Sequence, residues 1–192
     1  LARANVNLGV MTTYRVGGSA ALYVEASSEQ ELSQVATAHQ TTHLPILIIG
    51  KGSNLLVADS GFSGIAVSLG GPYAGSEIDA DTAVVRAGGP VALPALARRC
   101  VHSGLTGFEW AVGVPGSVGG AVRMNAGGHG SDMNASVVQA RIFDFSTSAA
   151  ELWDKSRLHF GYRQSAVEQS QLVVEATLQL AHDLDDRAQD TL

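Results

Sequence analysis

A continuous apolar run at residues 46–49, Ile-Leu-Ile-Ile, leads directly into Gly50-Lys51-Gly52-Ser53-Asn54. Such a run is typical of a strand that is buried on both faces. The glycines after it leave backbone N–H groups with no Cβ in the way, and groups of this kind can surround a phosphate. A tight turn between two strands would use the same residues, so the pattern leaves both interpretations open.

Two familiar phosphate-binding motifs do not fit this segment. A P-loop needs a glycine five residues before the Gly-Lys pair and Ser or Thr after the lysine, whereas Gly52 follows Lys51. A dinucleotide-binding fingerprint needs a third glycine where Leu55 stands, followed by a helix. Residues 55–58 alternate instead like a short strand.

A second glycine-rich region, residues 113–130, contains seven glycines. Pro115 and Gly116 predict a turn, and Ser117 can cap a helix after it. Backbone so poor in side chains suits the close approach of a large planar ligand, although an ordered loop with glycine corners would look the same. Because the chain has two such regions, ligand binding is favoured.

Hydrophobic periodicity predicts alternating strands and helices around these regions. Ser28 and Glu31 have the spacing of a helix-capping pair. Gly70-Gly71-Pro72 marks a boundary, so we expect an α+β chain with subdomains at 1–71 and 72–192. Expected strands are 20–26, 46–49, 55–58, 64–69, 82–87, 136–145 and 172–181; expected helices are 29–39, 93–103, 121–125 and one beginning near Asp183.

Composition argues against several classes of protein. The chain carries 12 Lys and Arg against 18 Asp and Glu, and it has no basic run, which disfavours a nucleic-acid partner. No stretch approaches the roughly 20 apolar residues of a membrane span. The single Cys100 excludes an intramolecular disulfide and is expected in the core.

Isolated polar residues give weaker signals. His39 and His43 have the spacing of helical metal ligands, but Gln40 stands where a zincin has Glu, so we expect surface histidines and no metal site. No Gly-x-Ser-x-Gly elbow indicates a hydrolase nucleophile. Arg15 and Arg163 each follow a tyrosine, and an arginine fork suits a carboxylate or a phosphate, with a plain surface charge as the alternative.

Taken in order, several segments resemble the UDP-N-acetylenolpyruvoylglucosamine reductases, also called UDP-N-acetylmuramate dehydrogenases. The glycine motif around Pro115, followed by Met124-Asn125-Ala126-Gly127, is specific, and Gly161-Tyr162-Arg163 strengthens it. The resemblance covers nearly the whole chain. The matching segments are residues 12–18, 50–57, 104–109, 113–122, 124–127 and 160–165.

The resemblance implies a vanillyl-alcohol-oxidase/p-cresol-methylhydroxylase-type FAD-binding fold, with non-covalent FAD between two α+β subdomains. Both glycine-rich regions would then contact the cofactor, the first at its diphosphate. By the resemblance, the cofactor-binding residues are Tyr14, Arg15, Gly50, Lys51, Gly52, Ser53, Asn54, Leu55, Gly113, Val114, Pro115, Gly116, Ser117, Gly119, Gly120, Asn125, Ala126 and Gly127.

The family reaction reduces an enolpyruvyl ether of a UDP-sugar with NADPH during peptidoglycan precursor synthesis. Arg163 matches the family's catalytic arginine, which stabilises negative charge on the enolpyruvyl carboxylate. The resemblance further implies a cytoplasmic monomer without a nucleic-acid or membrane partner.

The family's proton-donor Ser and second catalytic Glu lie in a third domain, and we expect the chain to stop before it. Neither Ser165 nor Glu168 is assigned those roles. His129 stands where the family commonly has Tyr, and covalent attachment of a flavin there is not expected. Two alternatives stay open: a flavin oxidase or dehydrogenase with another substrate, and a non-catalytic module of the same fold.

Overall fold

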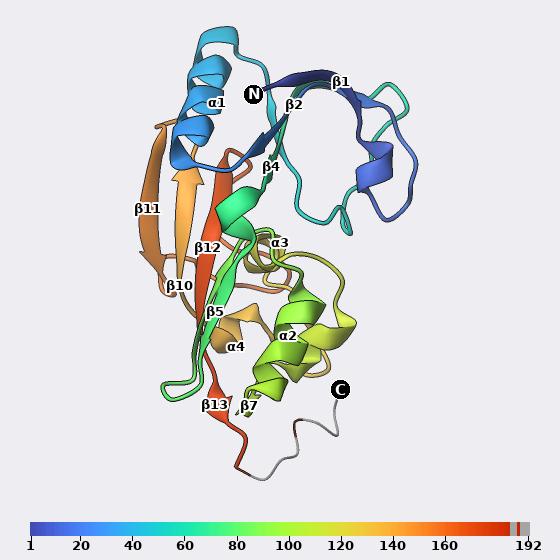
Figure 1. Ribbon diagram of the computed structural model, residues 1–192. Coiled ribbons are helices and arrows are strands. Elements are labelled where there is room, and N and C mark those ends of the chain that lie inside the picture. The colour runs from blue at the N-terminus through green and yellow to red at the C-terminus, as the bar shows by residue number, and fades with distance from the viewer. Residues whose placement is uncertain (185–187, 189–192) are drawn as a thin grey trace.

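The computed structural model describes residues 1–184 and 188, which contain two main sheets (Figure 1). The first has the strand order β1-β2-β4-β3. Its last three strands are parallel, whereas β1 pairs antiparallel with β2. The helix α1 (Glu29–Thr42) connects β2 to β3, as a parallel pair requires. The strands are β1 (Arg3–Asn7), β2 (Ser19–Ala26), β3 (Ile46–Ile48) and β4 (Phe62–Leu69).

The second sheet has the order β11-β10-β12-β6-β5, with every neighbouring pair antiparallel. The helices α2 (Leu93–His102), α3 (Val118–Arg123) and α4 (Met133–Ser136) pack against its strands in one core. The strands are β5 (Ser76–Asp79), β6 (Val84–Gly88), β10 (Val137–Asp144), β11 (Ala149–Asp154) and β12 (Gln171–Gln179).

Strand β12 belongs to two hydrophobic cores. Successive side chains of a strand point to opposite faces of its sheet. Val173 accordingly packs in the core with α2 and α3, whereas Leu172 and Val174 pack with α1 and the first sheet. The two sheets therefore share a core at this strand, and Gln40 of α1 adds hydrogen bonds to the carbonyls of residues 145 and 146, both 3.0 Å.

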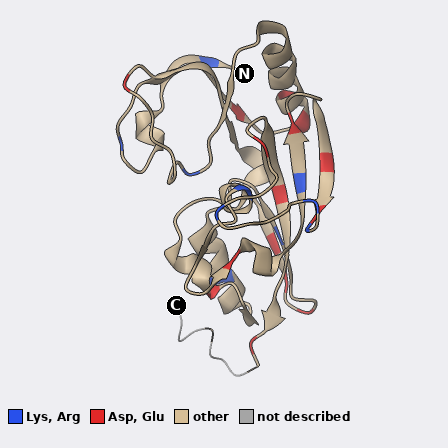
Figure 2. Ribbon diagram, turned by 180° about the vertical axis from the view of Figure 1, so that it is seen from behind, with Lys and Arg blue, Asp and Glu red and all other residues tan. Residues whose placement is uncertain are grey.

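Short elements complete the described part of the chain. Figure 2 shows Lys and Arg dispersed along the chain rather than gathered on one element. The short elements are η1 (Gly9–Met11), η2 (Gly71–Ala74), β7 (Leu105–Thr106), η3 (Glu109–Gly113), β8 (Gly127–Gly128), β9 (Ser131–Asp132) and β13 (Ala181–His182).

The structure confirms most of the predicted elements, but the strand predicted at 55–58 is wrong. These residues form a loop in which Val57 is buried, and the Ala58 carbonyl accepts from the N–H groups of Gly18 and Gly61, both 2.9 Å. The alternation of apolar residues in this segment therefore reflects which side chains pack in the interior, and not pairing with another strand. The short helix expected at 121–125 begins earlier, at 118. The helix expected near Asp183 lies mostly outside the described residues.

Strands β1, β5 and β11 were not predicted. They are edge strands whose side chains are mostly exposed, so they lack the apolar alternation by which a strand is found in a sequence. Cys100 is buried as expected, and burial raises the pKa of its thiol to about 11.

Candidate cofactor-binding site

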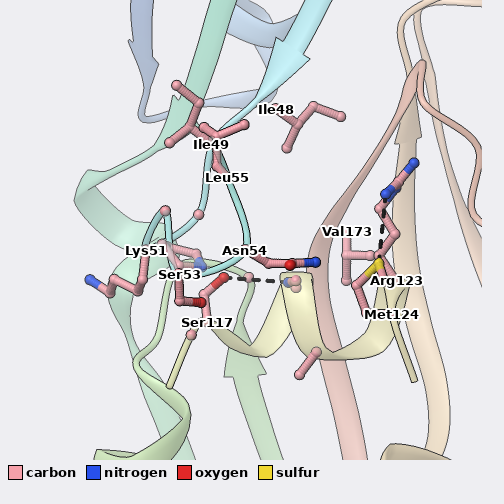
Figure 3. A pocket seen from close by; sticks show the side chains of 18 of the residues that line it. Ile48, Ile49, Lys51, Ser53, Asn54, Leu55, Ser117, Arg123, Met124 and Val173 are labelled. Atoms are coloured by element: carbon pink, nitrogen blue, oxygen red, sulfur yellow. Dashed lines mark hydrogen bonds between the residues drawn. The ribbon is translucent and has the colours of Figure 1, made fainter. Parts of the chain in front are cut away.

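A cavity of about 490 Å³ is lined by both glycine-rich regions and by the start of β12 (Figure 3). Its wall combines the loop after β3, the segment before α3, and α3 itself. In Figure 3, Lys51, Ser53 and Ser117 lie on one side of this cavity, whereas Arg123, Met124 and Val173 lie on the other. A single ligand could thus contact all of these elements.

The loop of residues 50–54 leaves its backbone donors free. Within the described part of the chain, none of its five N–H groups donates a hydrogen bond, although the Gly52 carbonyl accepts from Thr13 at 3.1 Å. Gly52 has φ +65°, and a Cβ there would lie 2.0 Å from the Met11 carbonyl oxygen. Only glycine fits this position, which holds the loop against the segment around Met11.

The two glycine-rich regions meet directly at the cavity. Ser53 Oγ donates to the Pro115 carbonyl at 3.2 Å. A Cβ on Gly50 would come within 2.3 Å of Ser117 Oγ, so the two loops approach more closely than any larger residue would allow. The N–H groups of Gly116 and Ser117 donate no hydrogen bond within the described residues. Free backbone donors therefore come from both loops.

The first turn of α3 behaves differently. The Val118 and Gly119 N–H groups donate to the carbonyls of Val91 and Gly89, both at 2.9 Å. The Gly120 N–H donates to Ser117 Oγ, which caps the helix. Because these donors already have partners within the protein, α3 contributes surface to the cavity rather than an anion site.

Arg163 lies in a tight turn that is hydrogen-bonded to the end of α3. It is exposed, lines the cavity and has φ +57°. The turn is closed by reciprocal backbone bonds between Gly161 and Gln164. Asn125 Nδ2 donates to the Gly161 carbonyl at 2.9 Å, and Ser165 Oγ donates to the Arg123 carbonyl at 2.8 Å. The turn is thus held from both sides.

Asn125 is a structural link rather than a lining residue. It is 4% exposed, has φ +40°, and uses its whole amide within the protein. Besides the bond to Gly161, Nδ2 donates to Asp132 at 3.0 Å, and Oδ1 accepts from the Asn134 N–H at 2.9 Å. The second glycine-rich region and the Arg163 turn are therefore joined through one buried side chain.

The structure brings most of the predicted site residues to the cavity. Those that line it are Gly50, Lys51, Gly52, Ser53, Asn54, Leu55, Val114, Pro115, Gly116, Ser117, Gly119, Gly120, Ala126 and Arg163. The others do not line it: Tyr14, Arg15, Gly113, Asn125 and Gly127.

The residues outside the cavity wall have other surroundings. Tyr14 and Arg15 are exposed in the loop after η1. Gly113 faces the His129 ring, whose Nε2 would lie 3.2 Å from a Cβ at that position, and Gly127 packs against Asp132. His39 Nδ1 lies 2.7 Å from the Leu44 carbonyl oxygen. The cofactor-binding roles of Tyr14, Arg15, Gly113 and Gly127 stay predictions from the sequence resemblance.

Several lining residues were not predicted from the sequence. Arg123, Met124, Gln169, Gln171 and Val173 come together only because α3 packs on β12. Gln171 also donates to Asp144 at 2.9 Å. Burial would raise the pKa of Asp144, but hydrogen bonds from Gln171 and Ser146 outweigh it and hold that pKa below its usual range.

Residues 20–148 match the family described as FAD binding domain. The chain belongs to this FAD-binding domain family. The residues present fit FAD, because free N–H groups from two loops suit a diphosphate and the apolar part of the cavity suits a ring system. FAD-binding by the glycine-rich regions was the expectation from the sequence resemblance.

Two of the chain's relatives carry the same enzyme name. The chain is 39% identical over 172 residues to the UDP-N-acetylenolpyruvoylglucosamine reductase of Synechococcus sp. strain RCC307, covering 90% of this chain and 56% of that protein. It is 37% identical over 179 residues to the same enzyme of Bacillus subtilis strain 168, covering 92% and 58%. The chain thus spans somewhat more than half the length of these relatives.

Solved structures establish the fold. The UDP-N-acetylenolpyruvylglucosamine reductase of Thermus caldophilus superposes with TM-score 0.85 at 29% identity, covering all of this chain and 67% of that one. A VAO-type flavoprotein of Myceliophthora thermophila gives TM-score 0.63 at 13% identity, covering 85% and 32%, which shows the fold alone. The predicted α+β, VAO-type FAD-binding fold is confirmed. Among the described residues, no helix is both long and apolar enough to cross a membrane.

Proposed function

We propose that the chain forms the FAD-binding part of an oxidoreductase that reduces the enolpyruvyl ether of UDP-N-acetylglucosamine to UDP-N-acetylmuramate with NADPH. One observation carries this proposal: an exposed arginine, Arg163, stands beside a cavity whose loops present free backbone donors. Cytoplasmic location, a monomeric state and a subdomain boundary at residue 71 belong to the same proposal.

The chain's own residues would bind and orient the reactants. The N–H groups of residues 50–54, 116 and 117 would donate hydrogen bonds to the cofactor's diphosphate. These bonds would stabilise its negative charge without a large basic patch. When bound, FAD supplies the hydride chemistry of such a reduction. Arg163 would hold the substrate carboxylate and stabilise the negative charge that develops on it, since a preorganised guanidinium favours the more charged state.

No residue of this chain is assigned as the proton donor of the reaction. Ser165 lies near Arg163 in sequence, but its Oγ donates to the Arg123 carbonyl and accepts from the Val167 N–H at 3.3 Å. Its contacts are those of a residue that fixes a loop. Glu168 is exposed and its N–H binds Gln171. These contacts support structural roles for Ser165 and Glu168 and give no support to a role in proton transfer.

The proposed role of Arg163 is tested by substituting it in the protein that carries this chain. Arg163→Ala should slow reoxidation of reduced flavin by the enolpyruvyl substrate by about a hundredfold or more, which corresponds to about 2.7 kcal/mol of transition-state stabilisation. Arg157→Ala is the matched control, because Arg157 pairs with Glu151 on the surface. A rate within threefold of the parent would remove Arg163 from catalysis.

A further inference from the structure

The Arg163 turn, residues 161–164, projects from a buried base. Leu158 at this base is buried, and its carbonyl accepts from the Ala166 N–H at 2.8 Å. The tip of the turn is exposed, and Arg163 Cζ lies 5.7 Å from the centroid of the Tyr162 ring. The Arg163 side chain makes no hydrogen bond or ion pair with any described residue. Its place at the cavity is therefore set by the backbone of the turn.

Two hydrogen bonds attach this turn to the end of α3. Asn125 Nδ2 donates to the Gly161 carbonyl at 2.9 Å. Ser165 Oγ, next to the turn, donates to the Arg123 carbonyl at 2.8 Å. Within the described part of the chain, the turn and Ser165 make no other hydrogen bond to a distant segment. These two bonds and the covalent connection to the buried base thus fix the turn relative to the cavity.

Asn125 occupies a position at which glycine is the usual residue. The Ala126 N–H donates to the Ala121 carbonyl at 2.8 Å, and the Asn125 N–H donates to the carbonyl of residue 122 at 3.2 Å. Together these are the two bonds of a Schellman motif at the end of a helix. Asn125 is the left-handed residue of this motif, with φ +40°. Glycine adopts that conformation without strain. Ending the helix does not require the amide of Asn125, so its role lies in the contacts that it makes.

We propose that Asn125 is a positioning residue, which acts through the Gly161 carbonyl to hold Arg163 in its place at the cavity. This inference rests on the catalytic role proposed above for Arg163. Asn125 is 4% exposed, and its Nδ2 also donates to Asp132 at 3.0 Å, so the amide is not available to a ligand. The end of α3 lines the cavity (Figure 3). The helix that lines the cofactor cavity thereby also supports the arginine, and a guanidinium stabilises developing charge only where it is correctly placed.

Asn125→Gly, made in the protein that carries this chain, separates positioning from helix termination. It removes the amide but keeps a residue that adopts a positive φ, so the dissociation constant of FAD should stay within about threefold of the parent. Reoxidation of the reduced flavin by saturating enolpyruvyl substrate should slow about tenfold, because a displacement of about 1 Å can cost about a hundredfold in rate. Asn134→Ala is the matched control, since only its backbone N–H binds the Asn125 amide, and its rate should stay within about twofold of the parent.

A double-mutant cycle with Arg163 gives a readout that a merely structural role would not move. In an Arg163→Ala background, Asn125→Gly should slow reoxidation by less than about twofold, because the group that it positions is already absent. Equal slowing by Asn125→Gly in both backgrounds would assign Asn125 to general stability or to the cofactor site, and would overturn the inference. A parent-like rate in Asn125→Gly alone would overturn it as well.

Failure of this inference can be told from failure of the proposed function. A parent-like rate in Arg163→Ala refutes the proposed catalytic role, and the positioning of Arg163 then loses its meaning. A slow Arg163→Ala together with a parent-like Asn125→Gly refutes only the positioning. If Asn125→Gly does not fold, Asn125→Asp decides by the same cycle, because it keeps the size and the acceptor of the side chain but has no donor for the Gly161 carbonyl.

Discussion

The loop at residues 50–54 and the glycines in the first turn of α3 line one cavity but use their backbone differently. In residues 50–54 the N–H groups have no partner within the described chain, so they are available to an anion. In the first turn of α3 the N–H groups bind Val91, Gly89 and Ser117, so glycine there serves close packing. A glycine-rich sequence therefore marks an anion site only where its donors remain free.

The largest expected effect in this comparison is at Gly52. Gly52→Ala places a Cβ 2.0 Å from the Met11 carbonyl oxygen at φ +65°, so we expect at least about 3 kcal/mol loss in the free energy of unfolding, measured in urea. Gly104→Ala is the matched control: its φ is +74°, but no atom lies within 4 Å of the added Cβ. It should cost about 1–2 kcal/mol from backbone strain alone. Equal losses in the two variants would contradict the packing of the loop on Met11.

The next effect is at Asn125, which joins the second region to the Arg163 turn. Asn125→Ala removes three hydrogen bonds of a buried side chain and strains a residue with φ +40°, so the free energy of unfolding should fall by about 3 kcal/mol. Asn134→Ala is the control, because only its backbone N–H takes part in this network, and it should change stability by less than about 0.5 kcal/mol. Equal stability of both variants in urea would show that the network is dispensable.

A double-mutant cycle tests whether the two regions meet. Gly50→Ala places a Cβ 2.3 Å from Ser117 Oγ, so it should cost about 1.5 kcal/mol unless that hydroxyl is removed. Ser117→Ala alone should cost about 1 kcal/mol, because Ser117 caps α3. In the double variant, the loss in the free energy of unfolding should be about 1 kcal/mol smaller than the sum of the two single losses, as measured by thermal or urea unfolding. Strict additivity would mean that the two loops lie apart in solution.

The smallest effect is expected at Gly119 in α3. Gly119→Ala brings a Cβ 3.1 Å from the Val173 carbonyl oxygen, but alanine favours the helix by about 1 kcal/mol, so stability should change by less than about 1 kcal/mol. The affinity for FAD should stay within about threefold, because the Gly119 N–H already binds Gly89. A loss above tenfold in a fluorescence titration would show that the first turn of α3 binds the cofactor as residues 50–54 do.

Much of this arrangement could be predicted from the sequence. A buried strand ending in glycines located the loop at 50–54, and Ser117 was predicted to cap a helix. Arg123 could not be found, because its place at the cavity depends on how α3 packs on β12 rather than on any local motif. Asn125 was predicted to bind the cofactor, but its bond to Gly161 spans 36 positions, a distance over which sequence pattern carries no signal.

Residues 55–58 show that a pattern of buried and exposed residues does not by itself predict a strand. Their alternation of buried and exposed side chains is real, since Val57 is buried and Leu56 is 71% exposed. No strand pairs with them, and the carbonyl of Ala58 accepts instead from the loop N–H groups of Gly18 and Gly61. Hydrophobic periodicity indicates which side of a segment is buried. Whether the segment pairs as a strand depends on which other segments lie beside it in the fold.

The central claim is that free N–H groups on two loops form a binding site for FAD. Equilibrium titration of the purified apo-protein with FAD, followed by the flavin absorption spectrum after removal of free ligand, tests it most directly. The account predicts saturable one-to-one binding with a dissociation constant below about 10 µM, a constant that Gly52→Ala raises at least a hundredfold. A folded parent protein that retains no flavin at about 100 µM FAD would contradict the account.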